Sequence, residues 1–236
     1  MSSCTRATRG ATTTLTFFFA PGVELVITSV GSPKDVLPRL REAGVAVYAD
    51  VATLRHAELA AAAGVDGLVL LTAGAGGQTG WLNPFAFVRA VRAVFDGTLV
   101  LAGGVSDGAG VVAAQALGAD LVYLGTRFIA TTESRARPDY KSALVDSTLD
   151  DVTTSTQVSG LAANILTSWV REHGDAPSAD SAGFSHQRLL TGDQVWAAGH
   201  SASGTDDILP VRELVDRLVD EHRAALDALP IPTSWR

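Results

Sequence analysis

The stretch that decides the fold lies at residues 67–80 and reads Gly67-Leu68-Val69-Leu70-Leu71-Thr72-Ala73-Gly74-Ala75-Gly76-Gly77-Gln78-Thr79-Gly80. Its first five residues are apolar, which is typical of a strand buried on both faces of a parallel sheet. Four of its last seven residues are glycines, and a backbone without Cβ atoms can lie close to a bulky planar ligand. The stretch therefore predicts a buried strand that runs into a ligand-binding loop.

The same alternation of apolar and amphipathic runs recurs along the chain. Strands are predicted at residues 24–28, 46–50, 67–71, 99–102 and 121–124. Helices are predicted at residues 33–43, 54–63, 84–95 and 108–117. Gly44, Gly64 and Gly118 each stand just before the next strand, where helix C-caps belong. This order predicts an α/β fold with a parallel sheet wrapped by helices.

Composition narrows the class of protein. The 236 residues are 47% hydrophobic, and their net charge of −7 is spread along the chain, so a nucleic-acid partner is not expected. No apolar run reaches the ~20 residues that a membrane-spanning helix needs, and we expect the protein in the cytoplasm. The single cysteine, Cys4, allows neither an intrachain disulfide nor a cysteine metal cluster. No metal-ligand spacing occurs elsewhere, so no metal site is expected.

Small and polar residues directly follow the predicted strands. They are Thr28-Ser29, Asp50, Thr72, Gly103-Gly104 and Gly125-Thr126. Because the carboxyl ends of parallel strands meet at one edge of a sheet, we expect one functional site there. Two adjacent loops, at residues 103–108 and 125–128, can present backbone N–H groups to an anion, as the phosphate loops of a (β/α)8 barrel do. Asp50 would be either a buried acceptor that holds neighbouring loops or a contact to the substrate.

Three segments of the chain, residues 74–80, 101–107 and 118–134, resemble the nitronate monooxygenases, formerly called 2-nitropropane dioxygenases. The specific signature is Ala102-Gly103-Gly104-Val105-Ser106-Asp107-Gly108, followed at the right distance by Gly118-Ala119-Asp120 and Leu124-Gly125-Thr126-Arg127-Phe128. The resemblance extends from about residue 23 to the C-terminus. It implies a TIM (β/α)8-type barrel and the cofactor FMN.

The resemblance also implies where FMN would bind. Its phosphate would lie against Gly103, Gly104, Gly125 and Thr126. Tyr123 and Leu124 would contribute backbone from the end of the last strand, and Gly76 and Gly77 would run beside the isoalloxazine ring. The alternative interpretation is that these glycines only shape turns and strand-helix packing.

Gln78 departs from the family pattern, which has a histidine at this position. In the family that histidine removes the α-proton of a neutral nitroalkane, and an amide cannot titrate. Gln78 can still donate a hydrogen bond to a nitro or carbonyl oxygen. We therefore expect oxidation of alkyl nitronates with O2 to a carbonyl compound and nitrite, without turnover of neutral nitroalkanes. Two alternatives are that Gln78 marks a subgroup with another substrate, or that His200 in a late glycine-containing loop replaces the base.

The predicted barrel is incomplete. A (β/α)8 barrel has eight strands in about 250 residues, whereas five are predicted here, and residues 23–28 resemble the fourth strand of the family barrel. Residues 1–21 contain no acidic residue and are interpreted as a non-native-looking or disordered segment, such as the product of a shifted frame or a misplaced start. Only residues 14–20 of this segment could form a strand. Residues 22–135 would form the βα units of the FMN-binding barrel.

Residues 136–236 are predicted to form a helical and loop region packed on the barrel. Helices are predicted at residues 138–146, 161–172 and 211–228, and a loop at residues 174–183. The last helix would pack through a stripe made of Leu214, Val215, Leu218, Val219 and His222. An incomplete barrel exposes apolar strand faces and an unpaired edge, which predicts a homo-oligomer joined through that edge.

Two other functions fit the same sequence. A flavin-dependent enoyl-thioester reductase would use the same barrel with NAD(P)H as reductant. A non-catalytic remnant would bind a flavin or another phosphate ligand without turnover. The flavin content of the purified protein and anaerobic reduction by NADH would distinguish these functions.

Overall fold

The computed structural model describes residues 3–4, 22–156, 158, 160–173 and 195–229. Its main sheet has six parallel strands in the spatial order β1-β2-β3-β4-β6-β7. These strands are β1 (Ser3–Cys4), β2 (Leu25–Thr28), β3 (Ala46–Val51), β4 (Gly67–Leu71), β6 (Thr98–Ala102) and β7 (Leu121–Tyr123). The five predicted strands are confirmed, with bounds within one residue. Within the described residues β1 and β7 stand at the two ends of the order, so the sheet is open there.

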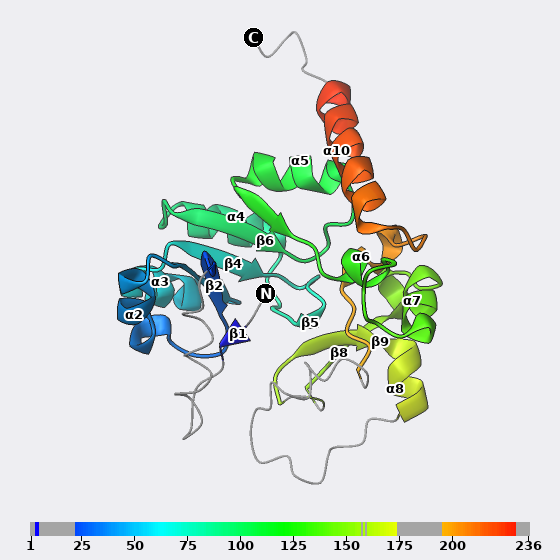
Figure 1. The fold of residues 1–236 in the computed structure, drawn as a ribbon, viewed down its shortest axis with the longest axis horizontal. Helices are drawn as coiled ribbons and strands as arrows, with labels where there is room; N and C mark the ends of the chain where they lie inside the picture. Colours follow the sequence, from blue (N-terminus) through cyan, green and yellow to red (C-terminus); the bar gives the residue numbers. More distant parts are fainter. Residues whose placement is uncertain (1–2, 5–21, 157, 159, 174–194, 230–236) are drawn as a thin grey trace.

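Helices connect the strands of the main sheet (Figure 1). They are η1 (Pro33–Asp35), α2 (Leu37–Glu42), α3 (Leu54–Ala63), α4 (Pro84–Arg92) and α5 (Gly108–Leu117). The predicted helix 33–43 is wrong as one element: η1 ends at Asp35 and α2 begins at Leu37, with Pro38, which has no N–H to donate one turn back, in its first turn. Helix α4 ends three residues before the predicted residue 95. Gly44, Gly64 and Gly118 have positive φ angles of 71°, 87° and 101°, which confirms the predicted caps.

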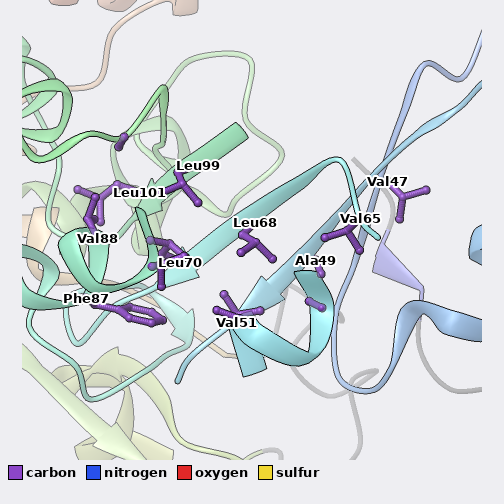
Figure 2. Close-up of a cluster of buried hydrophobic side chains, with 14 of the residues drawn as sticks. Val47, Ala49, Val51, Val65, Leu68, Leu70, Phe87, Val88, Leu99 and Leu101 are labelled. Carbon is purple, nitrogen blue, oxygen red and sulfur yellow. The ribbon is translucent and has the colours of Figure 1, made fainter. Parts of the chain in front are cut away.

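The two faces of the sheet carry two different apolar clusters. Leu68 and Leu70 of β4 belong to the large cluster under the helices, and Figure 2 shows them beside Leu99, Leu101, Phe87 and Val88. Val69 and Leu71 alternate with them and form a smaller cluster with Val100 and Ala102. We call the face that carries this smaller cluster the inner face. Since β4 is buried on both faces, its uninterrupted apolar run is explained.

A small antiparallel sheet lies apart from the main one (Figure 1). Its strands are β5 (Gly77–Gln78), β9 (Ala163–Leu166) and β8 (Val152–Ser155), in the spatial order β5-β9-β8. The predicted helix 161–172 is therefore wrong in its first half, and only α8 (Thr167–His173) is helical. Residues 163–166 pair with β8 on one side and with β5 on the other. These tertiary partners override the local helical pattern.

The remaining described elements are α6 (Thr126–Ile129), α7 (Pro138–Val145), η2 (Leu149–Asp151), η3 (His200–Gly204) and α10 (Val211–Ala228). Helix α10 has the predicted bounds and lies beside α5 (Figure 1). Leu214 is buried, and His222 Nε2 is 2.9 Å from Gln115 Oε1 of α5. Val215 and Val219 are exposed, so the predicted packing stripe is wrong for these two valines, because α10 turns only one narrow face to α5.

Two predicted segments, the strand 14–20 and the loop 174–183, lie outside the described residues. Of the N-terminal segment, only Ser3–Cys4 is described, and it pairs in parallel with β2. The proposed division at residues 21 and 135 stays a prediction.

Candidate functional site

The glycine loop, residues 72–80, carries the chain from β4 into β5 and is held by one buried side chain, Asn164 of β9. Asn164 Nδ2 donates to Ala73 O at 2.9 Å, to Ala75 O at 2.8 Å and to Thr79 Oγ1 at 3.2 Å. Its Oδ1 atom accepts from Thr154 Oγ1 at 2.5 Å. Because Asn164 is 1% exposed, these bonds have no competition from water. Asn164 therefore determines the path of the glycine loop.

Asn164 lies in a segment whose sequence pattern predicts a helix, so its role in holding the glycine loop is not apparent from the sequence. The available signal was a polar amide within the run Ala163-Asn164-Ile165-Leu166, all of which is buried. A buried amide must find hydrogen-bond partners. Its partners come from the glycine loop, which lies far away in the sequence.

The late loop that contains Gly199 packs directly on the glycine loop. His200 N donates to Gly74 O at 3.0 Å, and Gly199 N donates to Thr126 Oγ1 at 2.9 Å. A Cβ atom on Gly199 would overlap Gly74 O and lie 2.7 Å from Gly76 N. The His200 side chain is exposed, so what reaches the glycine loop is the backbone of this residue.

The two predicted phosphate loops lie against the glycine loop. A Cβ atom on Gly74 would be 3.1 Å from Gly104 N, and one on Gly76 would be 3.0 Å from Thr126 Oγ1. Gly103 has a φ of 121°, and a Cβ there would be 2.5 Å from Ala75 N. Three separate loops thus meet at the carboxyl edge of the sheet, two of them through glycines and the third through Thr126.

Open space lies in front of two of these glycines. Gly104 and Gly125 are exposed, and a Cβ atom on either would meet no atom within 4 Å. The Thr126 side chain is buried and engaged with Gly199 N, so Thr126 can offer this space its backbone N–H. Tyr123 lies with the inner-face cluster, and Leu124 packs against the large cluster under the helices. The structure therefore brings the predicted binding residues together, with their backbone rather than their side chains at the opening.

Arg127 fixes the end of the second phosphate loop. Its guanidinium is 2% exposed and donates to Asp207 Oδ1 at 2.5 Å and to Asp207 O at 3.1 Å. Arg217 of α10 donates to the other oxygen of the same carboxylate at 2.7 Å. Helix α6 is thereby tied to the segment that leads into α10.

A polar cluster occupies the inner face beside the glycine loop, and its members are Ser29, Asp50, Gln78 and Tyr123. Ser29 Oγ donates to Gln78 Oε1 at 3.3 Å. Gln78 is half-buried, and its backbone pairs with Ala163 of β9. Each member follows or ends a different strand, which explains why local sequence patterns do not reveal the cluster.

Asp50 is the carboxyl group of this cluster. Burial raises the pKa of Asp50 to about 6, and the Ser29 hydroxyl, whose one proton is shared between Asp50 and Gln78 Oε1, lowers it in part. Within the described part of the chain, Oδ1 of Asp50 is buried and has no hydrogen-bond partner. Burial and the negative charge of Asp50 both raise the pKa of Tyr123. If Asp50 held neighbouring loops as a hydrogen-bond acceptor, Oδ1 would need a donor, and no described residue supplies one.

Replacing Asp50 with asparagine is expected to increase the free energy of unfolding at about pH 8 by about 3 kcal/mol. The pKa of this carboxyl rises from 3.8 to about 6 on folding. Between these two pH values the folded state therefore binds more protons than the unfolded state does. The wild-type protein therefore loses stability as the pH rises through the window, whereas asparagine has no charge to bury. Denaturant unfolding at several pH values measures the difference, which should vanish below about pH 4.

The matched control is Asp96→Asn, at an exposed site between α4 and β6. This variant should unfold like the wild type at every pH. An Asp50→Asn variant that is less stable than the wild type at about pH 8 would contradict the prediction, because it would mean that the carboxylate has a stabilising partner.

These features define a class of protein. It is a parallel α/β protein of the TIM-barrel type in which glycine-containing loops meet at the carboxyl ends of the strands. Among the described residues, no three His, Cys, Asp or Glu side chains are grouped so that they could hold a metal ion. No helix in the described ranges has the length and apolar character needed to cross a membrane.

A family model described as nitronate monooxygenase matches residues 6–221. The chain therefore belongs to the nitronate monooxygenase family, as the sequence motifs predicted.

Individual relatives and a solved structure agree with this assignment. A nitronate monooxygenase of Paraburkholderia phytofirmans is 34% identical over 160 residues, which cover 64% of this chain and 44% of the relative. A Rhodococcus jostii enzyme named as a 5-hydroxy-7a-methyl-1-oxo-octahydro-1H-indene-4-carboxyl-CoA dehydrogenase is 31% identical over 144 residues, or 61% of this chain and 41% of the relative. The structure of a nitroalkane oxidase from Streptomyces ansochromogenes matches with a TM-score of 0.81 and 29% identity, covering 94% of this chain and 70% of that one. The chain spans about half or less of the length of the first curated relatives it matches.

Proposed function

We propose that this chain is an FMN-dependent oxidoreductase of the nitronate monooxygenase type, which oxidises alkyl nitronates with O2 to a carbonyl compound and nitrite. The observation that carries the proposal is the meeting of three glycine loops around open space at Gly104 and Gly125. Backbone N–H groups without neighbouring Cβ atoms suit a phosphate group. A flat ring system could then lie along Gly76 and Gly77, where the backbone is exposed or half-buried.

The residues of the chain fit FMN in a specific way. Gly103, Gly104, Gly125 and Thr126 would hold the phosphate through their backbone, with Tyr123 and Leu124 contributing backbone from the end of β7. When bound, the flavin would accept electrons from the substrate and pass them to O2. The protein would supply orientation, exclusion of water and hydrogen bonds.

Gln78 is proposed to bind the substrate. Its Oε1 atom is engaged by Ser29, and no described residue accepts a hydrogen bond from its Nε2 atom. The two N–H groups of Nε2 can therefore donate to the oxygens of a nitro or nitronate group. This contact would orient the substrate without moving a proton, because an amide does not titrate in this range.

The second candidate function is oxidation or reduction of a thioester substrate, including the enoyl-thioester reductase considered from the sequence. It is favoured by the relative whose name specifies a carboxyl-CoA substrate. A non-catalytic flavin-binding remnant is the third candidate. Self-association through the β7 edge, where Leu121 is 53% exposed, is part of each proposal.

The test of the function begins with FMN-loaded protein mixed with ethyl nitronate in the absence of O2. Bleaching of the flavin absorbance followed by nitrite release on admission of O2 is expected. Reduction by NADH and an enoyl thioester, with no reaction of the nitronate, would support the second function instead. Flavin that is bound but reduced by neither would leave the remnant interpretation.

Replacing Gly125 with alanine is expected to weaken FMN binding by about tenfold or more without destabilising the protein. The new methyl group would meet no protein atom within 4 Å but would enter the space proposed for the phosphate. The φ of −105° at this position is accessible to alanine. Flavin fluorescence titration measures the affinity, and thermal unfolding without FMN is the control. An unchanged affinity would place the phosphate elsewhere.

A further inference from the structure

We propose, on the basis of the oxidoreductase function above, that Asp50 is the proton acceptor of this site and that the chain therefore also accepts neutral carbon acids, with nitroalkanes as the test class. A carbon acid of this kind carries its acidic C–H bond next to a nitro group. The expectation from Gln78 alone, that neutral nitroalkanes are not turned over, is replaced by this inference.

Asp50 lies on the face of the sheet that carries the proposed substrate site. On β3, Val47, Ala49 and Val51 pack under the helices, whereas Tyr48 and Ala52 pack with the inner-face cluster. Because side chains alternate along a strand, Asp50 lies on the inner face. Its neighbour across the sheet is Val69 of β4, the strand that leads into the glycine loop. The carboxyl group is thus on the same face and at the same sheet edge as the proposed substrate site.

The groups around Asp50 leave it free to accept a proton. Facing it are the Ser29 hydroxyl after β2 and the Tyr123 phenol of β7, while Ser29 also contacts the Gln78 amide of β5. No basic side chain of the described residues contributes to its pKa, which burial raises to about 6. The carboxyl is therefore ionised at neutral pH and basic enough to act there. Its Oδ1 atom has no partner among the described residues.

Other titratable groups at the site are less suitable. Gln78 has no proton-accepting group in this pH range. The His200 side chain is exposed. The raised pKa of Tyr123 keeps this phenol neutral at ordinary pH, where it can only donate a hydrogen bond.

The proposed step is a proton transfer that consumes no oxidant. The C–H bond next to the nitro group breaks, its electron pair moves onto the nitro oxygens, and Oδ1 of Asp50 binds the proton. The products are a nitronate and a neutral Asp50 carboxyl, which later returns its proton to water. Gln78 Nε2 would stabilise the growing charge on the nitro oxygens, and the nitronate would then enter the oxidation proposed above.

A buried carboxylate that costs stability and leaves one oxygen, Oδ1, without a partner among the described residues fits a catalytic group better than a structural one. In contrast, the exposed residues Asp66 and Asp120 both have backbone donors: the Asp66 carboxylate accepts a hydrogen bond from Val47 N at 2.8 Å, and that of Asp120 accepts from Leu99 N at 2.8 Å. Both of these acidic residues accept a hydrogen bond from a backbone N–H group near the amino end of a strand. Asp50 lies near the carboxyl end of its strand and accepts no hydrogen bond from a strand N–H group of the described residues.

The test is exchange of the α-protons of nitroethane in D2O, followed by NMR with FMN-loaded protein in the absence of O2. The wild type is expected to accelerate exchange, with a rate that rises as the pH increases through about 6. Asp50→Asn is expected to lower the protein-catalysed rate by about 100-fold. Asp96→Asn, at an exposed position, should exchange like the wild type. Titration of the Asp50 carboxyl by ¹³C NMR should give the same pKa as the exchange profile.

Turnover of ethyl nitronate separates this inference from the proposed function. Asp96→Asn, at an exposed position outside the site, should retain nitronate turnover. A wild type that oxidises the nitronate but does not accelerate exchange would overturn the inference and leave the function standing. Exchange that depends on Asp50 without any nitronate oxidation would support the inference and reject the function. Equal exchange by wild type and Asp50→Asn would overturn the role of Asp50.

Discussion

Replacing Asn164 with aspartate is expected to destabilise the protein by about 4 kcal/mol and to abolish FMN binding. Asn164 donates to Ala73 O, Ala75 O and Thr79 Oγ1 from a position that is 1% exposed. An aspartate has no N–H to donate, and its negative charge would face two carbonyl oxygens without access to water. The glycine loop would lose its main support, since the same side chain holds both ends of its central turn. Denaturant unfolding and flavin titration measure the two effects.

The chain offers a matched control in Asn83, which caps the N-terminus of α4. Asn83 Oδ1 accepts from Phe85 N at 2.9 Å, and an aspartate at this position can accept the same bond. Asn83→Asp should therefore change neither stability nor FMN binding appreciably. If Asn164→Asp behaved like Asn83→Asp, the hydrogen bonds donated by the Asn164 amide would not be what positions the glycine loop.

Replacing Gly103 with alanine is expected to cost about 4 kcal/mol and to prevent the phosphate loop from meeting the glycine loop. Two independent effects add. The φ of 121° is strained for any residue with a Cβ atom. That Cβ would also lie 2.5 Å from Ala75 N and from Thr72 Oγ1, where the backbone cannot yield cheaply. Circular dichroism during thermal unfolding should show a large fall in the midpoint.

Comparison with Gly125→Ala distinguishes an effect on the stability of the protein from an effect on ligand affinity. Its methyl group would meet open space, so only ligand affinity should change there, whereas Gly103→Ala should change stability in the absence of FMN. Equal stability of the two variants without FMN would contradict the geometry at Gly103.

The βα units were predictable because each depends on local chemistry. Helices α3 and α5 have the predicted bounds, and their C-cap glycines have the positive φ that the pattern required. Parallel order also places strand carboxyl ends together, so the meeting of Gly76, Gly103 and Thr126 followed from the sequence. The prediction failed at residues 163–166, whose strand structure depends on pairing with β5 and β8.

The sequence alone determined the repeating strand-helix units, the positions of the glycines and the family motifs, because apolar periodicity and turn chemistry act between near neighbours. Only the tertiary structure placed Asn164 under the glycine loop and gathered Ser29, Asp50 and Gln78 on one face. Contacts of this kind join residues that are distant in the chain, and no periodic pattern records them. The same burial raises the pKa of Asp50, because desolvation depends on what surrounds a carboxyl group and not on its neighbours in sequence.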